Sequence, residues 1–203
     1  MTHDVKMVVV ACNTASSLAI NFLKRCFRVP VIGVIEPGAI GAVKVTRNKR
    51  IGVIGTHATI SSGAYEEAIK KISSGISVFT KSCPLFVPLV EEGWLDNKVT
   101  DEIAHIYLSG FRSRGVDTLI LGCTHYPLLK RSVRKVMGDG VMLVDSAMEV
   151  ANQAKALMDS CGLSNAGRAA GKCKFFVSDE PGRFINMAER FLKRRIKCDK
   201  RQT

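Results

Sequence analysis

Residues 119–125 read Leu-Ile-Leu-Gly-Cys-Thr-His, and residues 8–14 read Val-Val-Val-Ala-Cys-Asn-Thr. The two stretches share one plan: an apolar run ends in a small residue, a cysteine follows, and a helix start with a threonine comes next. Strands that are apolar throughout are buried on both faces, which is typical of a parallel sheet covered by helices. Because the plan occurs twice at a long spacing, the sequence predicts two similar α/β lobes.

The rest of the chain continues this alternation of apolar runs and helical spacing. Strands are predicted at 5–11, 31–35, 51–55, 77–80, 118–122, 141–144 and 173–177. Helices are predicted at 14–27, from about 37, and at 62–72, 99–114, 127–137, 148–158 and 181–195, with an apolar loop at 85–94. Strands that alternate with helices form parallel sheets flanked by helices, so the predicted fold class is α/β.

The composition is that of a globular protein. Of the 203 residues, 46% are hydrophobic and 24% are charged, which supplies enough apolar material for a sizeable core. No apolar run approaches the ~18 residues needed to span a bilayer, and no secretory signal pattern precedes the first strand. We therefore expect a cytoplasmic protein with no membrane partner.

The net charge is unusual, because 30 Lys and Arg residues against 18 Asp and Glu residues give +12. Residues 187–203 hold seven basic and two acidic residues, which contribute +5 of that charge. A solvated helix face followed by a basic tail explains this distribution, and a site for nucleic acid or another polyanion is the less favoured alternative.

Seven cysteines stand at positions 12, 26, 83, 123, 161, 173 and 198. None of them has the close spacing of a zinc site, so no metal is predicted. Without a secretory signal they are expected to be free thiols in a reducing compartment. Only Cys12 and Cys123 come directly after a predicted strand, whereas the other five lack the context of a site.

Cys12 and Cys123 lie where ligands of α/β sheets bind, beyond the carboxyl ends of strands. A thiol at a helix N-terminus meets unpaired N–H groups, which are expected to lower its pKa from ~8.5 toward neutral. The same N–H groups can hold a carboxylate, helped by nearby polar side chains, namely Asn13, Thr14 and Thr124. Two facing thiols suit the removal of a proton from one face of a carbon and its return on the other, without a cofactor. A structural role as a buried hydrophobe is the alternative for each cysteine.

Six blocks of sequence occur in a fixed order along essentially the whole chain. They are Cys12-Asn-Thr-Ala-Ser16, Gly33-Val-Ile-Glu-Pro-Gly38, Gly52-Val-Ile-Gly-Thr-His-Ala-Thr59, Cys83-Pro-Leu-Phe-Val-Pro-Leu-Val-Glu-Glu-Gly93, Gly122-Cys-Thr-His-Tyr-Pro127 and Phe176-Val-Ser-Asp179. Together they resemble the glutamate racemases. The resemblance implies a cofactor-independent enzyme that converts L-glutamate to D-glutamate for peptidoglycan, with a site in the cleft between two lobes.

The resemblance also implies roles for particular residues. Cys12 and Cys123 would be the paired proton donor and acceptor. The substrate's charged groups would be contacted by Asn13, Thr14, Thr124 and His125, and Thr56 would face the same pocket.

The second thiol would be assisted by His125 and by a glutamate of the Val-Glu-Glu-Gly block, which by spacing is Glu92 rather than Glu91. Without the resemblance, His125 could simply cap the helix that follows it. His125 also favours glutamate as the substrate, because aspartate racemases tend to carry Glu at this place.

The sequence departs from the family before Cys12. Family members usually carry an Asp-Ser-Gly segment and a Tyr-Gly pair before the first cysteine, and neither lies before Cys12 here. We therefore expect an incomplete first lobe, residues 1–36 plus 144–203, and a second lobe, residues 37–143. An uncovered sheet edge or core face in the first lobe predicts association, as a homodimer. The missing Asp and Ser, which in the family assist the first thiol and contact the substrate, predict impaired racemisation. A catalytically inactive binding or regulatory protein and an aspartate racemase are the alternatives.

Overall fold

The computed structural model describes residues 4–165, 167, 171–197 and 199–200. The chain divides into two compact units, Met1–Ser164 and Asn165–Thr203. The two lobes expected from the sequence stay a prediction. No helix within the described ranges is both long enough and apolar enough to cross a membrane.

A four-stranded parallel sheet forms the main layer of the first unit. Its order is β4–β3–β5–β6, from the strands β3 (Arg50–Gly55), β4 (Ser77–Ser82), β5 (Thr118–Gly122) and β6 (Met142–Val144). The central strands β3 and β5 run in register from the pair Ile51 and Thr118 to the pair Gly55 and Gly122. All five residues of β5 are buried, as the sequence predicted. Cys123 therefore leaves the carboxyl end of a central strand.

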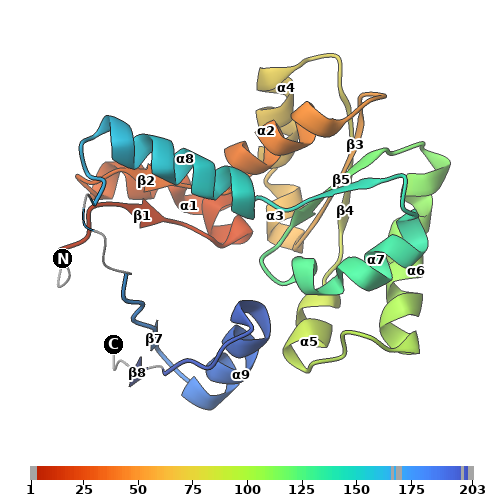
Figure 1. Cartoon of the computed structure of the whole chain (residues 1–203). Coiled ribbons are helices and arrows are strands. Elements are labelled where there is room, and N and C mark those ends of the chain that lie inside the picture. The colour runs from red at the N-terminus through yellow and green to blue at the C-terminus, as the bar shows by residue number, and fades with distance from the viewer. Residues whose placement is uncertain (1–3, 166, 168–170, 198, 201–203) are drawn as a thin grey trace. The chain divides into compact units, whose positions relative to one another are not determined.

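Helices cover both faces of this sheet. One face packs against α2 (Ile35–Val45) and α4 (Ala64–Ile72), whose apolar side chains form a core with Ile51, Val53 and Ile120. Figure 1 shows α6 (Lys98–Ser113) and α7 (Lys130–Met137) on the other side. This arrangement confirms the predicted α/β class with a helix-flanked parallel sheet.

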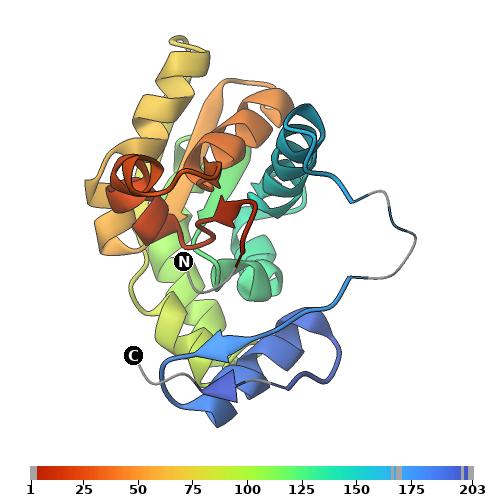
Figure 2. The same cartoon turned by 90° about the vertical axis from the view of Figure 1, so that its left-hand side faces the viewer.

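A smaller parallel pair carries the first cysteine. It consists of β1 (Val8–Val9) and β2 (Val31–Ile32), with Val8 opposite Val31. The Val10 N–H donates to the carbonyl of Ile32 at 2.8 Å, which extends the pairing by one residue. The helix α1 (Asn13–Cys26) follows, and Figure 2 shows α1 (red) and α8 (Ala147–Ser160, teal) on either side of the pair.

The described residues of the second unit form a short parallel pair and one helix. These elements are β7 (Phe176–Val177), α9 (Pro181–Leu192) and β8 (Asp199–Lys200), with Phe176 opposite Asp199. The expected basic tail is described only in part, because residues 198 and 201–203 lie outside the described residues.

Two of the differences between the predicted and the observed helices involve a proline and a glycine. The predicted loop 85–94 contains the helix α5 (Phe86–Glu91), because Phe86 and Val90 lie one turn apart and are both fully buried. Its Pro88 lies in the first turn, where a missing N–H removes no helical hydrogen bond. The predicted helix 62–72 begins two residues later, as α4, because Gly63, with a φ of 66°, is its N-cap residue and separates it from the helix α3 (His57–Ser61), which the sequence did not predict.

Candidate active site

Cys12 lies at the junction between the small strand pair and α1. It is the N-cap residue of the helix, and its carbonyl accepts the first helical hydrogen bond, from the N–H of Ser16 at 2.8 Å. The thiol is exposed. Residues 13–16 read Asn-Thr-Ala-Ser and include no acid, so the positive end of the helix can receive an anionic ligand.

The position of Cys12 is fixed by the hydroxyl of Ser16, which is 2% exposed. That hydroxyl donates to the carbonyl of Val10 at 2.7 Å and accepts from the N–H of Val34 at 3.2 Å. The Ser16 hydroxyl thus connects the first turn of α1 to the residues that follow β1 and to those that follow β2. Cys12 is therefore held between β1, which precedes it, and α1, which follows it.

Cys123 follows β5 and is buried, with 7% of its surface exposed. Burial raises the pKa of the Cys123 thiol, and a negative charge on Cys12 raises it further. Backbone N–H groups of His125 and Tyr126 and the hydroxyl of Thr124 act in the opposite direction. The predicted hydrogen-bond donors are therefore present, but the predicted lowering of the pKa is wrong for Cys123, because burial of the thiol outweighs them.

His125 lies between the Cys123 thiol and a carboxylate. Its Nδ1 is 3.7 Å from Cys123 Sγ, and its Nε2 is 3.4 Å from Oε1 of Glu91. The Thr124 hydroxyl lies 3.3 Å from the same Nδ1. This order of groups, a thiol, an imidazole and a carboxylate, can move a proton to and from sulfur.

The carboxylate that pairs with His125 is Glu91, whereas the sequence predicted Glu92. Glu91 is the last residue of α5, and Glu92 is its C-cap residue. The side chain of Glu92 lines an apolar pocket together with Leu85, Pro88, Leu89, Trp94 and Ile103. The assisting role of Glu92 stays a prediction, and the contact with His125 makes Glu91 a second candidate for that role.

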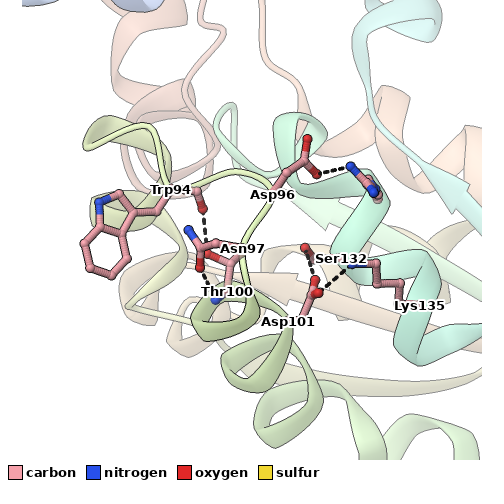
Figure 3. Close-up of polar contacts among 8 residues, drawn as sticks. Trp94, Asp96, Asn97, Thr100, Asp101, Ser132 and Lys135 are labelled. Carbon is pink, nitrogen blue, oxygen red and sulfur yellow. Dashed lines mark hydrogen bonds and ion pairs between the residues drawn. The ribbon is translucent and has the colours of Figure 1, made fainter.

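A network of polar contacts holds the segments that carry Glu91 and His125. Ser132 donates to Oδ1 of Asp101 at 2.6 Å, and Lys135 Nζ lies 2.5 Å from the other carboxylate oxygen. Asp96, in the loop after α5, pairs with Arg131 at 3.2 Å. Figure 3 shows these contacts between the α5–α6 segment and α7. These contacts lie close in sequence to the site, since Asp96 follows Glu91 in the chain and α7 follows His125.

Three threonine hydroxyls join α1 to the segment after β3. Thr14 Oγ1 lies 2.8 Å from Thr56 Oγ1 and 3.2 Å from Thr59 Oγ1, and the last two are 3.0 Å apart. The structure thus brings together Thr14 and Thr56, both predicted site residues. Thr59, which is 1% exposed, belongs to the same group but was not predicted.

Asn13, the residue after Cys12, is almost completely buried at 4% exposure. Its side-chain oxygen accepts a hydrogen bond from the hydroxyl of Tyr65 at 2.7 Å. Tyr65 comes from α4, 52 residues away, and nothing in the sequence marked it as a site residue.

The remaining cysteines and potential metal ligands do not extend the site. Cys26, Cys161 and Cys173 are exposed, Cys83 is buried, and Cys198 lies outside the described residues. In the part of the chain that the structure describes, no group of three or more His, Cys, Asp and Glu residues could hold a metal ion.

The family model for the Asp/Glu/Hydantoin racemases matches residues 1–154. The chain belongs to this racemase family. The glutamate racemase of Geobacter metallireducens is 52% identical over 190 residues, which are 94% of this chain and 70% of that protein.

Two solved racemase structures resemble this fold. The glutamate racemase isoform RacE1 of Bacillus anthracis has a TM-score of 0.94 at 36% identity, covering 99% of this chain and 75% of that one. The enzyme of Francisella tularensis, solved with D-glutamate, has a TM-score of 0.89 at 33% identity, covering 98% of this chain and 74% of that one. These relatives confirm the prediction of an isomerase that racemises glutamate.

Proposed function

We propose that this racemase interconverts L-glutamate and D-glutamate without a cofactor, with Cys12 and Cys123 as its two acid/base groups. The observation that carries the proposal is the matched placement of the thiols. Each follows a strand and precedes a helical segment, α1 after Cys12 and the 3-10 turn Tyr126–Leu129 shortly after Cys123. A pair of such groups suits a substrate held between them.

The reaction requires a proton to leave one face of Cα and another to arrive on the opposite face. In our proposal one cysteine, as thiolate, removes the α-proton, and the other, as thiol, delivers its proton to the far side. The negative charge that develops is shared by Cα and the adjoining carboxylate, where helix N–H groups can stabilise it. Each turnover exchanges the protonation states of the two sulfurs, which leaves the enzyme ready for the reverse direction.

Because the two thiols have different surroundings, they need different neighbouring groups to gain or lose a proton. The raised pKa of Cys123 suits a proton donor at neutral pH, since the thiol form predominates. To act as a base, Cys123 must lose that proton, and His125 Nδ1 at 3.7 Å can receive it. Glu91, at 3.4 Å from the other ring nitrogen, then stabilises the imidazolium.

We also propose substrate-binding roles for the polar residues beside the thiols. Asn13 and Thr14 lie in the first turn of α1, and Thr124 and His125 follow Cys123 directly. Thr56 joins the group through its contact with Thr14. Together they offer donors for the two carboxylates and acceptors for the ammonium group of glutamate.

The biological role that we propose is the supply of D-glutamate for peptidoglycan in the cytoplasm, by a homodimer. Exposed apolar side chains support association: Val9 is 43% exposed, Leu18 65% and Phe22 59%. Leu18 and Phe22 lie one turn apart on α1, so they share a face. Analytical ultracentrifugation of the wild type and of the Leu18→Glu/Phe22→Glu variant tests this part, and a monomeric wild type would exclude it.

The function is tested by incubating the purified protein separately with L-glutamate, D-glutamate and both enantiomers of aspartate. Circular dichroism follows loss of optical activity, and chelator-treated protein without added cofactor is used throughout. We expect both glutamate enantiomers to approach the same racemic end point, with far slower conversion of aspartate. Faster conversion of aspartate would make the protein an aspartate racemase, and no conversion of either would support a binding role.

A further inference from the structure

Tyr65 contacts the neighbours of both cysteines. It lies in the first turn of α4 and is 2% exposed. Its hydroxyl donates to Oδ1 of Asn13 at 2.7 Å, and Asn13 is bonded directly to Cys12 in the chain. This hydrogen bond is buried and joins residues 52 positions apart.

The other contact of Tyr65 is made by its ring. A Cβ added at Gly122, the residue before Cys123, would lie 3.1 Å from Cε2 of Tyr65 and 2.6 Å from the carbonyl oxygen of Ile54. A Cβ added at Gly38 would lie 3.2 Å from the Tyr65 hydroxyl. The ring therefore fills space that two glycines leave open, and it packs directly against the strand end that carries Cys123.

The hydroxyl of Tyr65 stays protonated in this environment. Burial raises the pKa of Tyr65 well above its ordinary value, and charge on Cys123 raises it further. A protonated phenol that donates to the Asn13 oxygen leaves the amide nitrogen of Asn13 as a donor with two hydrogens. The hydrogen bond therefore selects one of the two orientations of the amide and fixes it beside Cys12.

We propose that Tyr65 is a positioning residue for racemisation, which holds the Asn13 amide so that its N–H groups bind the substrate next to Cys12. The proposal rests on the proposed function, because it assumes that Asn13 contacts glutamate. Tyr65 itself touches no reacting atom, and its effect passes through Asn13. The Tyr65 ring also packs against Gly122. The same side chain therefore fixes the position of Asn13 relative to the strand end that carries Cys123.

The test uses three variants of the full chain, Tyr65→Phe, Asn13→Ala and the double variant. Tyr65→Phe keeps the ring and removes the hydroxyl, and loss of one hydrogen bond to a binding group is expected to raise KM for both enantiomers about tenfold. The value of kcat should change less than KM. In the Asn13→Ala background, Tyr65→Phe should have no further effect, since the group that it positions is gone. Tyr107→Phe is the control, because the Tyr107 hydroxyl accepts a long hydrogen bond, 3.4 Å, from the N–H of Leu85 and is not among the proposed site residues.

Additive losses in the double variant would overturn the proposal, since they would assign Tyr65 a structural role independent of Asn13. A wild-type KM for Tyr65→Phe would overturn it as well. If Tyr65→Phe does not fold, asparagine-labelled wild type is titrated with D-glutamate, and the side-chain amide signals of Asn13 are followed by NMR. Unchanged signals would overturn the proposal. Absence of racemisation in the wild type would instead refute the proposed function.

Discussion

Neutralising Glu91 should slow the racemase in one direction more than in the other. In the structure Glu91 Oε1 lies 3.4 Å from Nε2 of His125, and the two side chains are 35% and 26% exposed. At that distance two unit charges attract by about 5 kcal/mol at an effective dielectric constant of ~20, but by only about 1.2 kcal/mol in bulk water. Partial exposure places this pair toward the lower value, at about 1–2 kcal/mol.

That energy is gained when His125 becomes charged, which is when Cys123 acts as the base. Glu91→Gln should therefore slow removal of the α-proton by Cys123 about tenfold, since ~1.4 kcal/mol corresponds to a factor of ten. The enantiomer concerned is the one whose exchange is lost in Cys123→Ser. Removal of the proton from the other enantiomer, by Cys12, should change less.

The assay is incorporation of deuterium at Cα in D2O, followed by 1H NMR from each pure enantiomer at early times. Glu92→Gln is measured beside Glu91→Gln, because the two residues are adjacent and equal in charge. The larger effect is expected from Glu91→Gln. A tenfold loss in Glu92→Gln with none in Glu91→Gln would refute the structural assignment and support the one made from sequence.

Three further predictions concern the glycine behind the site, the α6–α7 contact and the thiols. Gly122→Ala should destabilise the fold by about 1–3 kcal/mol in urea unfolding, because its Cβ would lie 2.6 Å from a backbone carbonyl oxygen; unchanged stability would show that the strand end can adjust. The Lys135 ammonium and the Ser132 hydroxyl hold the pKa of Asp101 below its usual range. The carboxylate therefore stabilises the fold above the unfolded pKa of ~3.9, and the Tm difference from Asp101→Asn should shrink as pH falls below that value. Iodoacetamide at neutral pH should label the exposed Cys12 before the buried Cys123 in mass spectrometry, and the reverse order would contradict the described burial.

The sequence predicts well what depends on local pattern. The strand 118–122 is observed with the predicted bounds, and Cys123 leaves its carboxyl end as expected. The plan shared by residues 8–14 and 119–125 correctly placed two cysteines at strand ends, because an apolar run followed by a helix start is a local signal. The strand predicted at 5–11 is only Val8–Val9 in the structure, where it pairs with β2.

The environment of the site depends on packing that no local pattern reveals. Burial of Cys123 reverses the predicted direction of its pKa shift, because the fold removes the thiol from water as well as supplying N–H groups. The choice between Glu91 and Glu92 depends on where a short helix ends, and the two residues are identical in type. Tyr65 reaches Asn13 across 52 residues through tertiary contact alone, so only the folded structure identifies it.

The most direct test of the two-thiol account is exchange of the α-proton in Cys12→Ser and Cys123→Ser, measured from each pure enantiomer in D2O. Each variant should lose racemisation by at least ~10²-fold, since a positioned acid/base group contributes that much. Each should still incorporate deuterium into one enantiomer only, and the two variants should differ in which one. Exchange from both enantiomers at wild-type rates in both variants would contradict the assignment of the two cysteines.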